Sequence, residues 1–357
     1  MAEGNPLSFI KERIADIESG RASGRVYLHE DKPVDFYAVE LPNYERNFEV
    51  KVYDTVSEAI EEYFKNKETA NQGKQKASDL IKQVNTLLSK YYLKKKRLSE
   101  DLMKAENSEE LRLYGELLMA NLYRIEPGMS KITLQNYYDG TEVTIPLDKK
   151  LNGNRNAQAY FKKYGKQKTA VKEKQIQLDE NENDIVYLES VLSFLENTDN
   201  VLEIASLKEE LVENGYIRYR KVSGFKEKKA KMDPVKYTLS NGMIMLVGRN
   251  NKENDHLTFK LADKTDLWLH TKDIPGSHAL IKTNGIDITG IYREEEMDEK
   301  VVMEAAAIAA YHSKGRNGEN IPVDIVPIRY VKKPNGAKPG MVIFTNNRTV
   351  YVNPLKK

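Results

Sequence analysis

The chain has 357 residues, of which 31% are charged and 40% are hydrophobic, a balance that suits long solvated helices better than one large globular core. No apolar run approaches the roughly 20 residues that a membrane-spanning helix needs, and the N-terminal residues show no secretory signal, so we expect a cytoplasmic protein. The chain lacks cysteine, which excludes disulfides and thiolate metal sites.

Residues 1–55 contain the pattern of a short helix followed by a hairpin. The helix is expected over 6–20, and it ends at Gly20. Strands are expected over 25–30 and 35–41, on either side of the turn that contains Pro33. About 50 residues bury little core on their own, so this region resembles the end of a larger domain.

Residues 56–215 are dominated by two heptad patterns. Apolar residues or tyrosines recur every seven positions in each, namely Ala77, Val84, Tyr91, Leu98 and Ala105 in the first and Tyr164, Val171, Leu178, Ile185 and Leu192 in the second. Sustained 3–4 spacing is typical of coiled coils. We expect the two helices to pair antiparallel as one arm, although each helix packing on a separate partner is the alternative.

The connection between the two helices is itself structured. Residues 107–150 combine a helix with an apolar face, a stop at Pro127-Gly128, and alternating residues around Asp139-Gly140. The sequence therefore predicts a small helix-plus-hairpin tip. A further helix is expected over 201–214.

A basic linker is expected over 216–232. The net charge of the chain is only +2, but this stretch opposes one acidic residue, Glu227, to seven basic ones: Arg218, Arg220, Lys221, Lys226, Lys228, Lys229 and Lys231. Such a run neutralises phosphates, or else it is only a solvated linker.

Residues 233–357 have the pattern of a mixed domain of normal size. Strands are expected within 237–248, 256–262, 266–271, 278–283, 323–331, 340–345 and 348–353, and an alanine-rich helix over 298–313. The predicted fold class is thus α+β: a long antiparallel coiled-coil arm with a helix-plus-hairpin tip, followed by a C-terminal mixed α/β domain.

Two histidines flank a turn in this domain. A metal site would use His270, His278 and Asp273, but their spacing matches no standard metal motif. Alternatively Trp268 packs in the core beside hydrogen-bonded histidines. In a third interpretation Trp268 or the histidines stack on RNA bases, while Lys272 and Ser277 bind phosphate or ribose.

Two loops carry basic residues on turn-forming sequence. The first contains Arg249, Asn250, Asn251 and Lys252, and the second contains Lys332, Lys333 and Lys338 among prolines and glycines. Both are either ordinary charged turns or a surface for a polyanion. The chain has no P-loop, dinucleotide-binding glycine pattern or nucleophile elbow, and residues 294–296 suit an exposed turn better than a catalytic carboxylate pair.

Residues 248–281, with 331–342 further on, resemble the RNA-binding domain of the NFACT family, in the sequences GRNNKENDHLTFKLADKTDLWLHTKDIPGSHALI and VKKPNGAKPGMV. LRLYGELLMANLY and NAQAYFKKYGKQK resemble the coiled-coil region of the same family. Residues 1–55 are similar only to the end of its N-terminal region. We therefore expect a piece of a longer protein or a naturally short member.

The resemblance implies a role in ribosome-associated quality control. Family members bind the large ribosomal subunit that carries an obstructed peptidyl-tRNA, and they bring in tRNA for template-free alanine tailing that the ribosome catalyses. It implies rRNA and tRNA as partners, no enzyme activity and no cofactor. Because most of the N-terminal region is missing, complete tailing is not expected.

Two other functions remain as alternatives. A surface adhesin that binds fibronectin follows from an older name of the family, and a metal-dependent enzyme would use His270 and His278.

Overall fold

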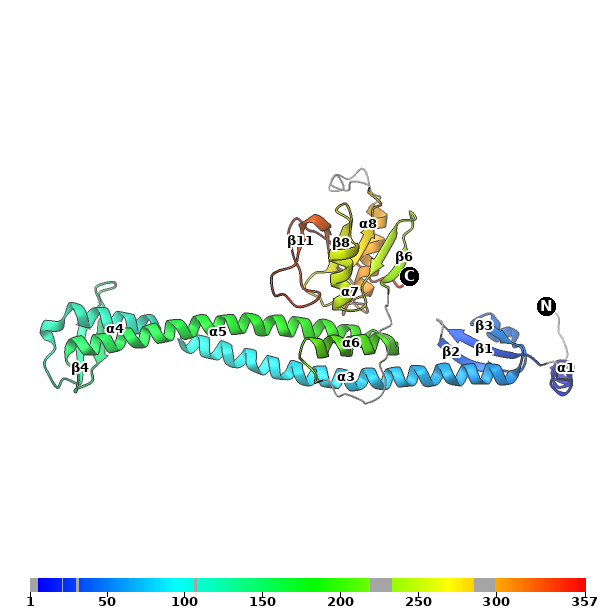
Figure 1. Cartoon of the computed structure of the whole chain (residues 1–357), viewed down its shortest axis with the longest axis horizontal. Helices are drawn as coiled ribbons and strands as arrows, with labels where there is room; N and C mark the ends of the chain where they lie inside the picture. The colour runs from blue at the N-terminus through cyan, green and yellow to red at the C-terminus, as the bar shows by residue number, and fades with distance from the viewer. Residues whose placement is uncertain (1–5, 21, 30–31, 106–107, 219–232, 286–298) are drawn as a thin grey trace. The chain divides into compact units, whose positions relative to one another are not determined.

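The computed structural model describes residues 6–20, 22–29, 32–105, 108–218, 233–285 and 299–357 (Figure 1). They form two compact units. The arm unit comprises residues Val84–Ser190 and Pro334–Met341, and the sheet unit comprises Met1–Gln83, Val191–Lys333 and Val342–Lys357. Two long helices, α3 (Val56–Ala105) and α5 (Gly153–Glu196), contribute to both units.

In the arm unit α3 and α5 pair antiparallel, as predicted (Figure 1). The Asn181 side-chain amide donates to the carbonyl oxygen of Tyr91 at 3.0 Å, and the Lys174 ammonium lies 2.6 Å from Asp101. Residue numbers along α5 therefore fall as those of their contacts on α3 rise, from 181 beside 91 to 174 beside 101. Val84, Leu88, Leu98, Ile185 and Leu188 are buried along the seam.

Charge complementarity supports this orientation. Five basic residues of α3 lie at 90–97, and the α5 segment 179–189 that runs beside them carries five acidic residues. One pair is in direct contact, with the Lys95 ammonium 2.9 Å from Glu182. A parallel pairing would lose this match, so flanking charges help to specify the direction of the pair.

The tip of the arm unit is the predicted helix and hairpin. It contains α4 (Ser108–Ala120), a short η1 (Leu122–Arg124), β4 (Lys131–Gln135) and β5 (Glu142–Pro146). Gly140 adopts a positive φ of 74° in the hairpin turn, a conformation that glycine adopts without strain. The core of the tip consists of seven buried residues: Leu117, Leu118, Ile132, Leu134, Ile145, Leu147 and Ala157.

The N-terminal part of the sheet unit contains one strand that the sequence analysis missed. After α1 (Pro6–Glu18) come β1 (Gly24–His29), β2 (Lys32–Tyr37), α2 (Pro42–Glu45) and β3 (Glu49–Tyr53). The sheet order is β2-β1-β3, so β1 is central and β3 pairs with the edge of β1 that faces away from β2. Val26, Leu28, Ala59 and Tyr63 form its small core against α3.

The C-terminal part of the sheet unit is a six-stranded sheet in the order β13-β10-β8-β9-β7-β6, with every neighbouring pair antiparallel. Its strands are β6 (Val235–Thr238), β7 (Ile244–Val247), β8 (Leu267–Thr271), β9 (Ala279–Lys282), β10 (Ile321–Pro327) and β13 (Arg348–Val352). Helix α8 (Glu299–Tyr311) covers one face (Figure 1). Ala305, Ala306, Ala309 and Ala310 are buried there, and such small side chains allow close approach to the strands.

The other face of this sheet is covered in two places. One cover is α7 (Asn251–His256) with the π-helical η2 (Leu257–Leu261), and the other is η4 (Ile328–Tyr330) followed by β11 (Val331–Lys332) and β12 (Ile343–Phe344). The predicted strand over 256–262 was wrong. Asn250 caps α7 by accepting from the Glu253 amide at 2.8 Å, and Glu253 accepts from the Arg249 amide at 3.0 Å. This reciprocal cap starts a helix that overrides the apolar alternation.

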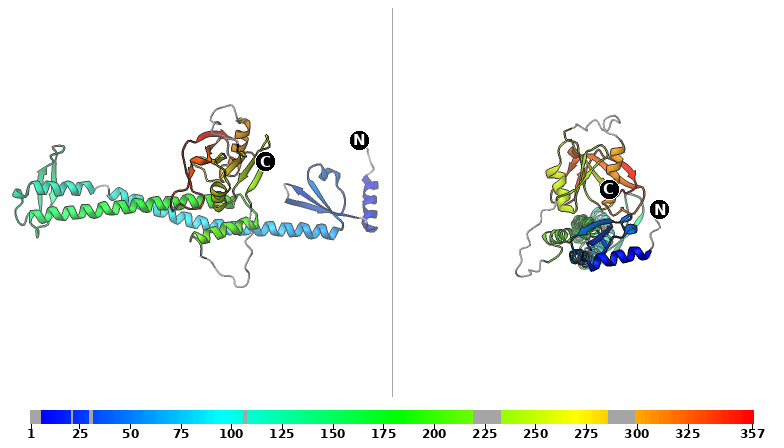
Figure 2. Two further views of the ribbon diagram at one scale, coloured as in Figure 1. Left: turned by 45° about the horizontal axis from the view of Figure 1, so that its top comes forward. Right: turned by 90° about the vertical axis from the view of Figure 1, so that its right-hand side faces the viewer.

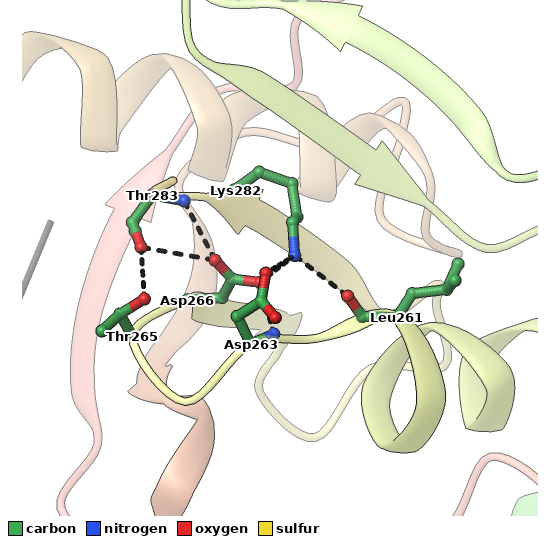
Figure 3. Close-up of polar contacts among 6 residues, drawn as sticks. All are labelled: Leu261, Asp263, Thr265, Asp266, Lys282 and Thr283. Carbon is green, nitrogen blue, oxygen red and sulfur yellow. Dashed lines mark hydrogen bonds and ion pairs between the residues drawn. The ribbon is translucent and has the colours of Figure 1, made fainter. Parts of the chain in front are cut away.

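A polar network fixes the end of η2 to the sheet (Figure 3). The Lys282 ammonium lies 2.6 Å from Asp263, 2.6 Å from Asp266 and 2.9 Å from the carbonyl oxygen of Leu261. Asp266 also accepts from the Thr283 amide at 3.0 Å. Burial by itself lowers the pKa of Lys282, but the hydrogen bonds to both carboxylates outweigh it and hold this pKa above its ordinary value.

Candidate nucleic-acid interface

The first predicted basic loop contacts a helix of the same unit. Helix α6 (Val201–Glu213) supplies Glu203, whose carboxylate lies 3.5 Å from the Arg249 guanidinium, and Glu210, which accepts from the Asn251 side chain at 3.1 Å. Lys252 forms an ion pair with Glu213. Asn250 and Asn251 are each only 3% exposed. The four predicted binding residues of this loop thus make internal contacts.

Trp268 is fully buried on β8. Its ring stacks on His270 with centroids 5.7 Å apart. The His278 ring lies edge-on to it and the Phe344 ring is tilted against it, with centroids 5.0 and 5.2 Å from that of Trp268. His278 and Ser277 are also buried. This is the placement that the core-packing interpretation predicts, and it leaves Trp268 no exposed ring face for a base.

The two histidines have different surroundings. His278 is buried, and its Nδ1 forms a 2.8 Å hydrogen bond with Thr258 Oγ1. His270 is half-buried. Burial lowers the pKa of His270, against the opposing effects of the Gly276 backbone and Asp324, so its ring is neutral near pH 7. Asp273 is exposed, and among the residues that the structure describes no three histidine, aspartate or glutamate side chains could hold a metal ion.

The three lysines of the second predicted loop differ in their contacts. Lys333 forms an ion pair with Asp255 in the sheet unit, and the Lys338 ammonium lies 3.2 Å from Asp184 in the arm unit. Lys332 is exposed, as is Lys272 beyond the end of β8. Among the predicted lysines that the structure describes, these two offer the most accessible charge.

Most of the predicted basic linker lies outside the described residues. Arg218 is described and exposed. The others, Arg220, Lys221, Lys226, Lys228, Lys229 and Lys231, fall within 219–232.

The sequence analysis missed a second basic run, which we call the basic segment, at residues 149–174 of the arm unit. It opposes the single acidic residue Glu173 to nine basic ones: Lys149, Lys150, Arg155, Lys162, Lys163, Lys166, Lys168, Lys172 and Lys174. Lys162, Lys163, Lys166, Lys168 and Lys172 are exposed on α5, and in the described part of the chain none of these five is ion-paired. The density of basic residues in this stretch could have indicated a polyanion-binding surface, but the sequence analysis considered only the heptad pattern of this helix.

Comparison with known proteins identifies both parts of the chain. Residues 6–231 match the family model of the NFACT N-terminal and middle domains, and residues 234–346 match that of the NFACT protein RNA binding domain. No helix among the described residues is long and apolar enough to cross a bilayer.

Similar proteins carry a consistent name. The Rqc2 homolog RqcH of Bacillus subtilis is 41% identical over 325 residues, covering 89% of this chain and 54% of the relative. The protein of the same name from Streptococcus pneumoniae serotype 2 is 39% identical over 306 residues, covering 85% and 53%. The chain therefore spans about half the length of these curated relatives.

A solved structure is also similar. The C-terminal part of the fibronectin/fibrinogen-binding protein from Streptococcus suis aligns with a TM-score of 0.61 and 35% identity, covering 79% of this chain and 95% of that one. These names include no enzyme class. The two family models together account for nearly all the described elements, and we conclude that the chain belongs to the NFACT family.

Proposed function

We propose that this chain is an RNA-binding part of the ribosome-associated quality-control machinery, and that it docks on the large ribosomal subunit carrying an obstructed peptidyl-tRNA. The relatives named RqcH and the match to an RNA-binding domain support this role. In the longer protein, tRNA would be recruited for alanine tailing in the cytoplasm while the ribosome forms the peptide bonds.

The basic segment is the observation that carries the proposal. Ribosomal RNA presents a dense array of phosphates, and each lysine that meets one releases condensed counterions. Five exposed lysines within eleven residues of α5 offer such contacts from a rigid helix. Two carry an aromatic support, since the Lys163 and Lys168 ammonium groups lie 5.3 and 5.8 Å from the ring centroids of Tyr160 and Tyr164.

The domain boundaries belong to this proposal. The arm over 56–215 would present the basic segment, the linker over 216–232 would add charge, and the domain over 233–357 would bind RNA through its exposed Lys272 and Lys332. Arg249 and Lys252 would contribute only after leaving their acidic partners on α6.

The test is co-sedimentation with purified large subunits over a series of salt concentrations. We expect affinity to fall steeply as salt rises, and a double Lys166→Glu and Lys172→Glu variant to bind at least tenfold more weakly with a smaller salt dependence. Both lysines are exposed, so the fold should be retained.

The matched control is a double Lys65→Glu and Lys76→Glu variant, which makes the same charge change at exposed positions of α3. It should bind within about twofold of the unchanged chain. Equal loss in the two double variants, or binding that ignores salt, would contradict the proposal.

The other two hypotheses are not favoured. The family models and the names of the curated relatives do not favour fibronectin binding as the function, and the described residues contain no candidate metal cluster.

A further inference from the structure

Among the described residues, none covers one part of the C-terminal sheet on the face opposite α8. We call it the open face, and it consists of two rows of residues set by strand register. Tyr351 pairs with Pro322, whose carbonyl oxygen accepts from the Lys272 amide at 2.9 Å. In the next row Thr349 pairs with Asp324, which pairs with His270.

Side chains of directly paired residues point to the same face, so each row presents a short line across three strands. Strand spacing places the ends of such a row about 10 Å apart. Val350 and Val352 belong to the core beneath α8, which puts their neighbours Thr349 and Tyr351 on the opposite face. The two rows therefore form one continuous surface.

Exposure increases across this surface. Trp268, in the row beyond His270, is buried beneath Phe344, whereas His270 and Thr349 are half-buried. Tyr351 is 59% exposed and Lys272 is exposed. The open face thus offers an accessible aromatic ring at one end of a row and an ammonium group at the other.

The second row is polar and held by hydrogen bonds. Asp324 accepts from Thr349 at 2.6 Å and from the Asn347 side-chain amide at 2.8 Å, which fixes the middle of the surface. Trp268 Nε1 is buried and has no hydrogen-bond partner among the described residues. A buried donor without an acceptor is rare in folded proteins, and here it lies one row from the open face.

We propose that the open face binds an unpaired RNA nucleotide, with the base stacked on Tyr351 and the adjoining phosphate held by Lys272. This inference rests on the proposed RNA-binding function and names the place in the C-terminal sheet that carries it out. Stacking on an exposed ring is how proteins hold single-stranded bases without requiring a given sequence. Duplex RNA, whose bases are already stacked, offers this surface no free base.

Neighbouring charges limit how many phosphates the open face binds. Asp273 is exposed beside Lys272, and Asp324 is buried with its Oδ1 accepting from Thr349 and Asn347. One lysine with one flanking carboxylate suits a single phosphate contact and not a long backbone track. The base, through Tyr351, therefore supplies most of the affinity of this site.

Trp268 makes the site directly observable because it is the one tryptophan of the chain. It stacks on His270, which borders the open face. Titrating the whole chain with a single-stranded RNA of about ten nucleotides should shift the Trp268 fluorescence and its indole N–H resonance. An RNA duplex of equal length at the same concentration should leave both signals unchanged.

Variants at Tyr351 and Lys272 test the two contacts by fluorescence anisotropy with the same RNA. Tyr351→Ala should weaken binding about 5- to 150-fold, as loss of one stacked base does, and Tyr351→Phe should stay within about twofold. Lys272→Gln should lower the slope of log affinity against log salt by about 0.7. Tyr123→Ala, at a more exposed tyrosine of the arm unit, is the matched control and should bind normally.

Three results would overturn the inference: unchanged binding by Tyr351→Ala, equal loss in Tyr123→Ala, or no binding of single-stranded RNA by the unchanged chain. Binding of an extended peptide to the free edge of β13, with RNA affinity unaffected by Tyr351→Ala, would also overturn it. Co-sedimentation with large subunits separates this failure from that of the proposed function, because ribosome binding through the basic segment does not need Tyr351.

Discussion

The arm unit and the C-terminal sheet use charge in opposite ways. Along the arm the interhelical pairs lie at the surface, as between Lys95 and Glu182, whose side chains are both nearly half exposed. Just before β8 the Asp266 carboxylate is fully buried. It forms an ion pair with the Lys282 ammonium and accepts a hydrogen bond from the Thr283 amide (Figure 3). Exposed pairs add little stability, whereas breaking a buried pair is costly. The exposed charges of the arm can therefore vary, and the buried Asp266 cannot.

The same contrast applies to surfaces that could meet RNA. The five exposed lysines of the basic segment have no ion pair in the described part of the chain, but Arg249 and Lys252 contact carboxylates of α6 (Figure 2 shows this helix and the sheet from two further sides). A basic residue in a loop is therefore weaker evidence for a polyanion site than a basic residue on the exposed face of a long helix. The loop has neighbours that the sequence does not reveal.

The largest effect is expected from Asp266→Ala. It removes the buried carboxylate from beside the Lys282 ammonium and leaves the Thr283 amide without its acceptor, and we expect the free energy of unfolding to fall by about 4 kcal/mol. Asp263→Ala is the matched control: it removes a carboxylate at the same 2.6 Å from Lys282, but Asp263 is 69% exposed. The expected loss there is below about 1 kcal/mol.

Urea unfolding followed by circular dichroism measures both variants. If the two aspartates proved equally costly, the contrast between buried and exposed pairs would not describe this molecule.

A second prediction concerns the seam of the arm. Leu188 is fully buried between α3 and α5, whereas Leu178 is half-buried where the companion positions are polar. Leu188→Ala should lower the free energy of unfolding by about 3 kcal/mol, and Leu178→Ala by about 1 kcal/mol. The two changes remove the same atoms, so thermal unfolding of the pair isolates burial. Similar losses would mean that the seam is packed evenly along its length.

The arm was predictable from the sequence because its contacts repeat. Val84, Leu98 and Ile185 stand in register with their own heptads, and each buried position is visible without knowing its partner. The hairpin at Asp139-Gly140 was also predictable, because its turn residues and its two alternating strands are adjacent in the chain.

The sheet was less predictable because its contacts are not local. Strand β3 was missed because its alternating valines include the exposed Val52 and no turn residues mark its pairing with β1. Helix α7 was missed because its cap, Asn250, was taken for a loop residue. Tyr351 and Lys272 become neighbours only through the register of β13, β10 and β8, which no local pattern encodes.

The smallest effect tests whether the sheet unit also keeps titratable groups from water. Burial lowers the pKa of His312 to about 4, and the nearby guanidinium groups of Arg316 and Arg249 add to this effect. The neutral ring forms a 2.7 Å hydrogen bond with the Tyr237 hydroxyl. Because the unfolded histidine has a pKa near 6.5, protons bind the unfolded chain preferentially, and stability is lost as the pH falls from about 6.5 towards 4.

Between pH 7.5 and 5.5 this residue should contribute a loss of about 1 kcal/mol. His312→Gln keeps an acceptor for Tyr237 but does not titrate, so its free energy of unfolding should fall less over this interval than that of the unchanged chain. Measuring both proteins in urea at the two pH values cancels the carboxylates, which they share. An equal fall in the free energy of unfolding of both proteins would mean that His312 is in contact with water. The titratable groups of the sheet would then be as exposed as those of the arm.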